Sequence, residues 1–309
     1  MRPTLRQLQY FVAVADHSAF GTAAQILAVS QPSLSKQLAI MEDELGAPLF
    51  ERTSRRVTLT PLGQLLLGRA RIILQDVREF RAVAQGSFGL FGDRLSIGVL
   101  PSIGAYFMPI ANRRLHELYP DLRLVVHEAA TMQLLERLRA GKVDAVIGTP
   151  TNSPEFKSIP LFTETLWICA ASDDPLSRSH TPVTAADLKG RPLLALSPEF
   201  TLADVVDRLA SEVGAYVSSD YQGGSLDAVR QMAVMGAGIA VLPSLYALAE
   251  AIRDPEFVVR RIDHPLAFHE IALHWRRASP LSADFEELAE KLMDVKREIR
   301  RGRAEQFGS

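Results

Sequence analysis

A group of residues near the start of the chain carries side chains that could recognise a polar surface. On an expected helix, at about 100° per residue, they share one side or stand at its tip: Gln31, Pro32, Ser35, Lys36 and Ala39. Amide, hydroxyl and ammonium groups donate hydrogen bonds, and the small residues beside them permit close approach. This face therefore suits the base edges and phosphates of a nucleic acid.

The same helix must bury its other side. Its apolar residues follow one another at spacings of four, three and four: Leu34, Leu38, Met41 and Leu45. Ser30 is placed as the N-cap, and Gly46 ends the helix. Pro32 is tolerated because the first turn has no internal N–H bond to lose.

Two further helices are expected around this one. The first covers residues 4–16, and the second starts after Ser18 with small alanines that let the next helix cross closely. We expect these two helices to bury Leu8, Phe11, Val12, Ala15, Ala23, Ala24, Ile26 and Leu27. The arrangement is that of a helix-turn-helix, although an ordinary pair of core helices would show the same spacing.

Residues 48–61, PLFERTSRRVTLTP, form two short extended runs around a basic tip. Arg52, Arg55 and Arg56 suit phosphates or the negative potential of a narrow minor groove. Beside a helix-turn-helix, such a hairpin is a wing. The alternative is a solvated run of charges, and Glu51 makes this run less uniformly basic.

The stretch AFGTAAQILAVSQPSLSKQLAIMEDELGAPLFERTSRRVTLTPLGQ resembles the winged helix-turn-helix of LysR-type transcriptional regulators over its whole length. The resemblance implies contacts to bases or phosphates from Gln31, Pro32, Ser35 and Lys36. It further implies phosphate contacts from Ser33 and Arg52, and insertion of Arg55 into the minor groove. Many members carry Arg at the position of Lys36, which weakens bidentate recognition of guanine here.

The composition describes a globular protein of more than one domain. The chain has 309 residues, of which 47% are hydrophobic and 23% charged. No apolar run reaches the length of a membrane span, and the start lacks the apolar block of a signal peptide, so we expect a cytoplasmic protein without a membrane partner. Residues 1–92 hold 10 of the 34 basic residues but only 7 of the 36 acidic ones, which fits a DNA-reading end.

Residues 61–85 are expected to form one long helix that pairs two chains. Its apolar stripe runs along the full length: Leu62, Leu66, Ala70, Ile73, Val77, Phe80 and Ala84. No small adjacent domain could cover a stripe of nearly 40 Å, at about 1.5 Å per residue, by itself. Packing against the following domain is the alternative. Residues 86–92, GSFGLFG, have the composition of a hinge.

From residue 93 onward, short apolar runs alternate with helical patterns, which predicts an α/β arrangement with mostly parallel sheets. The expected fold is therefore an N-terminal all-α winged helix-turn-helix (1–60), a linker helix with hinge (61–92) and an effector-binding domain (93–301). The family resemblance implies that this domain is similar to a periplasmic binding protein, with two crossover strands. Subdomain I would comprise 93–164 plus 268–301, subdomain II would comprise 165–267, and residues 302–309 would be a frayed tail.

Hydroxyl side chains recur where strands end and helices begin. Backbone N–H groups at such helix starts favour an anion or a polar group, so a small-molecule effector, anionic or polar, is expected between the subdomains. The candidate contacts are Ser102, Thr131, Thr149, Thr201 and Ser225. Each could instead be a helix N-cap, and only convergence on one cleft would decide for a ligand.

Three segments, among them VLPSIGAYFMP and HEAATMQLLERL, are similar to the peroxide-sensing OxyR-like branch of the family. In that branch Thr131 matches a pocket threonine, and a redox cysteine pair would align with Thr201 and Ala210. Neither of these residues can form a thiolate. The single cysteine, Cys169, lies in an apolar strand run where an inert, buried thiol is expected. The sequence therefore disfavours a disulfide-switched sensor.

Enzyme motifs are missing from the sequence: there is no P-loop, zinc-protease motif or nucleophile elbow, and the histidines, including His264 and His269, are scattered. We therefore expect no catalytic residues, cofactor or metal site. A solute-binding protein would need an export signal. The favoured interpretation is a DNA-binding regulator, dimeric or tetrameric, that reads a partly palindromic operator in double-stranded DNA, responds to its effector by changing DNA bending, and meets RNA polymerase.

Overall fold

The computed structural model describes residues 3–52, 56–84, 91, 94–179, 181–253 and 258–307. Its contacts divide the chain into two compact units, which are described separately. The first comprises residues 1–88 with 139–142 and 279–281, and the second comprises the rest. Within the described residues, no helix is both long enough and apolar enough to cross a membrane.

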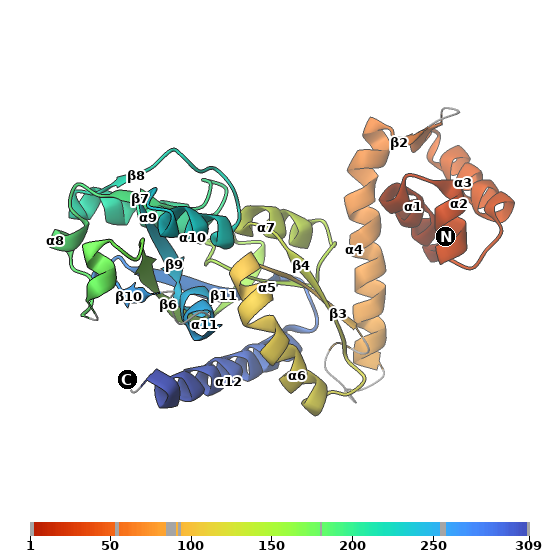
Figure 1. Cartoon of the computed structure of the whole chain (residues 1–309). Coiled ribbons are helices and arrows are strands. Elements are labelled where there is room, and N and C mark those ends of the chain that lie inside the picture. The colour runs from red at the N-terminus through yellow and green to blue at the C-terminus, as the bar shows by residue number, and fades with distance from the viewer. Residues whose placement is uncertain are drawn as a thin grey trace. The chain divides into compact units, whose positions relative to one another are not determined.

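The N-terminal unit consists of three short helices, a two-stranded hairpin and one long helix (Figure 1). The hairpin strands pair antiparallel, with Phe50 opposite Leu59. The bounds of these elements are α1 Leu5–His17, α2 Phe20–Ile26, α3 Gln31–Leu45, β1 Phe50–Arg52, β2 Val57–Leu59 and α4 Pro61–Ala84. The predicted winged helix-turn-helix is confirmed.

An aromatic cluster holds this unit together. The rings of Phe11 and Phe20 both meet Phe50 edge to face, with centroids 5.5 and 5.8 Å apart. Leu34 and Leu38 of α3 are fully buried beside them. Two predictions of burial were wrong: Ile26 is 57% exposed and Leu45 is 37% exposed. Both residues stand at the last turn of their helices, beyond the reach of the neighbouring elements.

The stripe along α4 is divided between two environments. Its first part, through Leu62, Leu66 and Ala70, packs against the core of the helix-turn-helix. Further along the helix, Ile73 and Phe80 are exposed. Helix α1 of the same chain therefore covers the first turns of α4, and pairing of two chains through the later part of the stripe stays a prediction.

The second unit is built on one mixed sheet. Its strand order is β4-β3-β5-β11-β6-β9-β7-β8, and β10 pairs with β6. The strands are β3 Arg94–Val99, β4 Arg123–Glu128, β5 Ala145–Gly148, β6 Phe156–Cys169, β7 Pro192–Leu194, β8 Tyr216–Val217, β9 Ile239–Pro243, β10 Val259–Arg261 and β11 Phe268–Arg276. Pairing is parallel at both ends of the sheet and antiparallel around β6 and β11, so the expectation of mostly parallel pairing holds only for the ends.

Strands β6 and β11 join the two halves of this sheet, as expected of crossover strands. The first part of β6 pairs with β11, and its last residues pair with β9 and β10. What the sequence presented as a short run, LWICAAS, is therefore the end of a strand that begins at Phe156. A β-bulge lies between Ile271 and Ala272 of β11.

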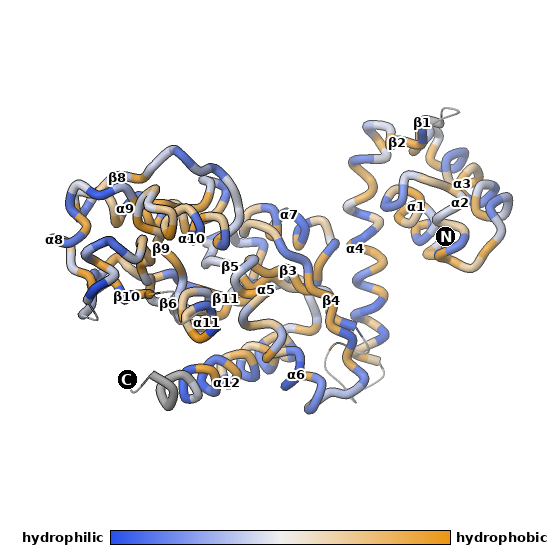
Figure 2. Tube along the Cα trace, viewed as in Figure 1, coloured by the Kyte–Doolittle hydropathy of each residue, from blue (hydrophilic) through white to orange (hydrophobic). Residues whose placement is uncertain are grey.

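Helices cover the sheet and fill the connections between its strands. Their bounds are α5 Pro101–Tyr106, α6 Met108–Leu118, α7 Thr131–Arg139, η1 Pro175–Arg178, α8 Ala185–Leu188, α9 Thr201–Val213, α10 Leu226–Val234, α11 Ser244–Arg253 and α12 Ser282–Phe307. Figure 2 shows hydrophobic residues concentrated along β9, whereas hydrophobic and hydrophilic residues alternate along α12. Helix α12 accordingly buries one side, including Phe285, Leu288 and Leu292, against β6, β11 and α6.

Two helix boundaries differ from the prediction. The single helix expected over 103–118 is broken at Phe107, which ends α5 and precedes α6 with a φ of −113°. The tail expected from residue 302 is helical as far as Phe307. Of the expected hinge at 86–92, only Phe91 lies within the described residues, and it is buried against Phe285.

Candidate functional site

The start of α3 is fixed by the cap that its sequence predicts. Ser30 Oγ accepts a hydrogen bond from the backbone N–H of Ser33 at 3.3 Å. At the other end, Gly46 has a φ of +69°, a left-handed conformation that glycine adopts without strain. Both caps hold α3 as a complete helix, so the direction of its exposed face is determined.

The predicted face of α3 is presented to solvent. Ser35 is half-buried, and the exposed members are Gln31, Pro32, Ser33 and Lys36. Leu34 and Leu38, on the opposite side, are fully buried. An exposed helix of small polar residues with one cation can enter a major groove without steric hindrance.

The hairpin is tied to α3 through a residue that the sequence analysis missed. Glu42 accepts hydrogen bonds from the backbone N–H groups of Leu49 and Phe50, at 2.8 and 3.2 Å. A glutamate eight residues before a strand gave no recognisable signal in the sequence. Arg52 belongs to β1, whereas Arg55 lies outside the described residues. Glu42 thus couples the orientation of the wing to that of α3.

A separate small pocket lies in the second unit, where several of its strands and helices end or begin. Segments far apart in sequence meet there: the end of β3 with the start of α5, the starts of α9 and α10, and strand β11. The lining is largely apolar, with three polar side chains. Its residues are Leu100, Pro101, Ser102, Leu196, Phe200, Thr201, Leu202, Gly224, Leu226 and His269. The pocket thus joins two of the predicted residues, Ser102 and Thr201, to one that was set aside, His269.

Thr201 and His269 bring unpartnered polar atoms to this pocket. Among the described residues, Thr201 Oγ1 and both ring nitrogens of His269 are buried without a hydrogen-bond partner. The His269 side chain belongs to β11 and is almost completely buried. The alternation of residues along FHEIALHW could have placed the His269 side chain on the buried face of its strand. Nothing in the sequence shows that Thr201 lines the same pocket.

Glu164, on the neighbouring strand β6, stands behind His269. Its Oε2 lies 3.9 Å from His269 Nδ1, and its Oε1 accepts a hydrogen bond from the backbone N–H of Leu245 at 2.8 Å. Burial alone would raise the pKa of Glu164, but the proximity of His269 and the positive charge of Lys296 outweigh burial and hold that pKa below its ordinary value. Glu164 is therefore a buried carboxylate rather than a carboxylic acid.

Thr131 and Thr149 form a pair of their own. Thr149 Oγ1 donates to Thr131 Oγ1 at 3.1 Å, and both residues are buried. Behind them, His274 Nε2 lies 2.9 Å from the carbonyl oxygen of Thr149, and His274 Nδ1 lies 2.7 Å from Ser158 Oγ. Burial lowers the pKa of His274, so its ring is a neutral link between Ser158 and the threonine pair.

Ser225 acts as a helix N-cap, the alternative role that its position before a helix allows. Its Oγ accepts a hydrogen bond from the N–H of Ala228 at 3.2 Å, which makes it the N-cap of α10. The residue is exposed and is not among those that line the pocket. Of the five hydroxyl residues, then, the structure brings Ser102 and Thr201 to one pocket, pairs Thr131 with Thr149, and leaves Ser225 apart.

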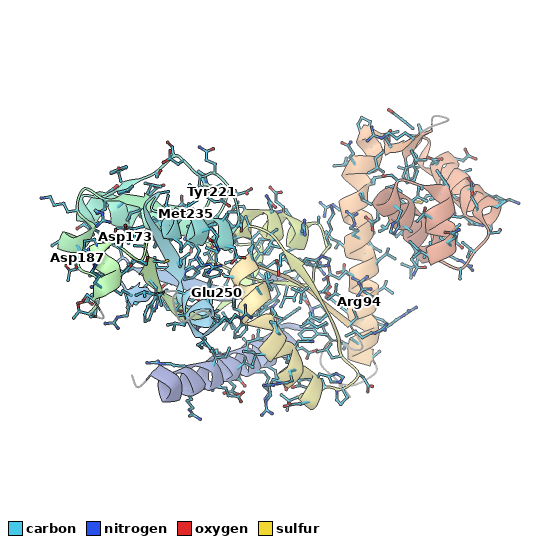
Figure 3. The ribbon with its side chains drawn as sticks, in the orientation of Figure 1. Arg94, Asp173, Asp187, Tyr221, Met235 and Glu250 are labelled. Atoms are coloured by element: carbon cyan, nitrogen blue, oxygen red, sulfur yellow. The ribbon has the colours of Figure 1, made fainter. Side chains whose placement is uncertain are left out.

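The two halves of the second unit also meet through tyrosines on α5 and α11. Tyr106 Oη donates to Glu250 Oε1 at 3.0 Å, and its ring meets Tyr246 edge to face at 5.3 Å (Glu250 is labelled in Figure 3). Burial and the bond to Glu250 raise the pKa of Tyr106 to about 12. The tyrosine is therefore a lasting hydrogen-bond donor between the halves.

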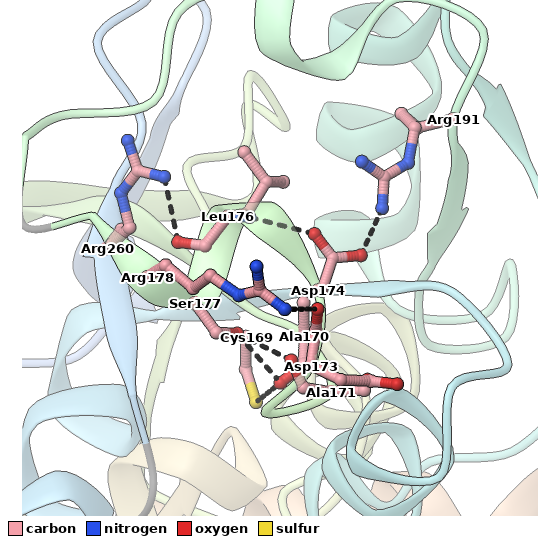
Figure 4. A network of polar contacts seen from close by, with 10 residues as sticks. All are labelled: Cys169, Ala170, Ala171, Asp173, Asp174, Leu176, Ser177, Arg178, Arg191 and Arg260. Atoms are coloured by element: carbon pink, nitrogen blue, oxygen red, sulfur yellow. Dashed lines mark hydrogen bonds and ion pairs between the residues drawn. The ribbon is translucent and has the colours of Figure 1, made fainter.

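The single thiol lies in a structural network rather than in the pocket. Cys169 is almost completely buried, and its Sγ is 3.8 Å from the carbonyl oxygen of Ala170 (Figure 4). Above it, Asp174 pairs with Arg191 and accepts from the N–H of Leu176. Burial raises the pKa of Cys169 to about 12, so thiolate chemistry at neutral pH is suppressed. Among the described residues, no cluster of three or more metal-ligating side chains occurs.

Two family models together cover nearly the whole chain. Residues 5–64 match the bacterial regulatory helix-turn-helix protein of the LysR family, and residues 89–297 match the LysR substrate-binding domain. The chain belongs to the LysR family of transcriptional regulators. As a member of this family it is a DNA-binding regulator with an effector-binding domain, which confirms the functional class predicted from the sequence.

The chain is similar to OxyR-type members of the family. It is 37% identical to the DNA-binding transcriptional dual regulator OxyR of Escherichia coli over 289 residues, which cover 93% of this chain and 94% of the relative. It is 33% identical to the hydrogen peroxide-inducible genes activator of Haemophilus influenzae, covering 96% of this chain and 98% of the relative. The predicted resemblance to the OxyR-like branch is confirmed.

Solved structures of the family agree with this fold. A cysteine-to-aspartate variant of full-length OxyR from Pseudomonas aeruginosa superposes with a TM-score of 0.77 at 30% identity, covering 94% of this chain and 95% of the other. A hydrogen peroxide-bound cysteine-to-serine mutant of Corynebacterium glutamicum OxyR gives 0.65 at 33%, covering 96% of each chain. The LysR regulator CbnR complexed with its target DNA, at 24% identity, has the same fold.

Proposed function

We propose that this regulator reads its operator with the exposed face of α3. Gln31, Pro32, Ser35 and Lys36 would contact bases or phosphates in the major groove. Ser33 and Arg52 would contact phosphates, and Arg55 would enter the flanking minor groove. The observation that carries this proposal is the orientation of α3, which buries Leu34 and Leu38 and exposes Gln31 and Lys36.

The regulator is proposed to act as a dimer that pairs through the later part of α4, and as a tetramer formed from two dimers. Phe80 is 72% exposed, and Ile73, about two turns earlier, is also exposed. Large apolar side chains in a row on one helix mark an interaction surface. Pairing there would present two α3 helices to a partly palindromic site.

The effector response is proposed to work without a disulfide. Thr201 stands in the pocket at a position where the OxyR-like resemblance places a redox cysteine, and the chain's single cysteine is the buried Cys169. A small molecule would instead bind among Ser102, Thr201 and the apolar lining. Its preference for one assembly state would change DNA bending and contact with RNA polymerase in the cytoplasm.

The test of DNA reading uses operator fragments selected by the wild-type protein from a random library. Lys36→Ala and Ser35→Ala should each weaken binding by about 1–3 kcal/mol in gel-shift titrations at fixed salt. Arg69→Ala, on the exposed side of α4, removes the same charge away from α3 and should bind as wild type. Equal affinity of all variants and wild type would rule out α3 as the reading surface.

A further inference from the structure

The pocket in the second unit is built around an uncapped helix start. Helix α9 has 13 residues, and its N-cap, Phe200, makes no capping hydrogen bond through its side chain. Phe200, Thr201 and Leu202 all line the pocket. The first N–H groups of a helix and its dipole favour a negative charge, so this end of α9 provides an electropositive wall.

Helix α11 shows how the same protein satisfies another buried helix start. There the carboxylate of Glu164 accepts hydrogen bonds from the N–H of Leu245, at 2.8 Å, and from Ser244 Oγ, at 3.3 Å. Glu164 is completely buried and retains its charge. A carboxylate is therefore an effective partner for a helix start in this interior, and none of the residues that line the pocket supplies one to α9.

His269 provides the second, independent feature of the pocket. It is 3% exposed, and its Nδ1 is the ring nitrogen closest to Glu164. Because Nδ1 faces Glu164, the other ring nitrogen, Nε2, is the one left to meet a polar group in the pocket. Thr201 Oγ1, also buried and without a partner among the described residues, adds a hydroxyl donor beside it.

The remaining walls restrict what the ligand can be. Apart from Ser102, Thr201 and His269, the lining is apolar, and none of the residues that line the pocket is acidic. The pocket is small, so it suits a small molecule with one polar end. A ligand with several charges would leave most of them without partners, at a large desolvation cost.

We propose that the effector is a small monocarboxylic acid whose carboxylate is held by His269, Thr201 and the start of α9. Its hydrocarbon part packs against Leu196, Phe200 and Leu226. This inference rests on the proposed regulatory function and assigns to His269 a direct contact with the effector.

The test measures binding of acetate, propionate, butyrate and benzoate, each beside its uncharged amide, to the full-length protein by calorimetry and thermal shift. At least one acid should bind and raise the melting temperature, whereas its amide should bind about tenfold more weakly. His269→Gln and Thr201→Val should each reduce affinity for that acid by about tenfold, the equivalent of one charge-assisted hydrogen bond. His116→Gln, an exposed histidine on α6, should bind as wild type.

Three outcomes would overturn the proposal: no acid binds, amides bind as well as acids, or both pocket variants bind the acid as wild type. Two substitutions are used because His269→Gln leaves Glu164 without its neighbour and could impair folding, whereas Thr201→Val preserves side-chain size. Gel shifts of the same preparations keep the inferences separate. If the protein binds DNA but none of the acids, only the carboxylate proposal is rejected. If the wild-type protein does not bind DNA, the proposed function itself is rejected.

Discussion

His274 Nε2 lies 2.9 Å from the carbonyl oxygen of Thr149. Because His274 Nδ1 also faces Ser158 Oγ at 2.7 Å, both ring nitrogens are occupied within the sheet. In the neutral ring Nε2–H donates to Thr149 and Nδ1 accepts from Ser158. This bond fixes the backbone that carries the Thr131–Thr149 hydroxyl pair, so a change at His274 should affect that pair.

The buried His274 should make the protein sensitive to mild acid. Its folded-state pKa is lowered from 6.5 by burial, so the unfolded state binds more protons as the pH falls. The free energy of unfolding should be unaffected by this group above about pH 6.5 and should decrease below it. Urea titrations across this range should show a smaller decrease for His274→Gln than for wild type. If His116→Gln, at an exposed position, flattens the profile equally, His274 is not the source.

Cys169 should be unreactive in the folded protein. Because burial raises its pKa to about 12, the thiolate population is very small, and the side chain is also inaccessible. A disulfide reagent at about pH 8 should label the protein only after urea unfolding. Cys169→Ala should bind operator as wild type does, with or without added peroxide. Rapid labelling of the native protein, or a peroxide response lost in this variant, would contradict the structural role.

Gly63 should tolerate no side chain, in contrast to Gly68 five residues later. A Cβ on Gly63 would overlap the carbonyl oxygen of Leu49, whereas a Cβ on Gly68 would meet nothing within 4 Å. Gly63→Ala should therefore destabilise the N-terminal unit by about 1–3 kcal/mol. Gly68→Ala should stabilise it by about 0.5–1 kcal/mol, because alanine is the better helix former. Chemical denaturation of both variants measures the change in the free energy of unfolding. Equal changes in the two variants would show that α4 is not in contact with Leu49.

Phe80→Glu should weaken self-association. The substitution places a charge in the exposed apolar row of α4, where a partner chain would have to bury it. Sedimentation at matched concentrations should show more monomer than wild type. Arg81→Glu reverses a charge at the next position, which is exposed but outside the row, and should sediment as wild type. Unchanged dimers in Phe80→Glu would place the seam on another surface.

The helix-turn-helix could be predicted from sequence because its signals are local. Ser30 and Gly46 act within one turn of the helix they limit, and Leu34 and Leu38 need only the helical period to share a face. Burial at helix ends was less predictable. Ile26 and Leu45 fit the apolar pattern, but their exposure depends on where the neighbouring helices stop.

The pocket could be predicted only in part. Ser102 and Thr201 carry a positional signal, since each lies at the start of a helix, and Thr201 is indeed beside the pocket. The contribution of His269 depends on the register between β11 and β6, which sets His269 opposite Glu164. That pairing spans more than a hundred residues of chain, and no local pattern in the sequence encodes it.

The cross-strand partnership of Thr165 with Phe268 has a consequence for how such regulators can be recombined. The chain enters the half of the sheet that contains β7, β8 and β9 at Thr165 and returns from it at Phe268, on the adjacent strand. The intervening block could therefore be exchanged for that of a relative with only two junctions, both inside regular backbone pairing. Chimeras built at this boundary would transplant one wall of the pocket while retaining the parental DNA-reading helices.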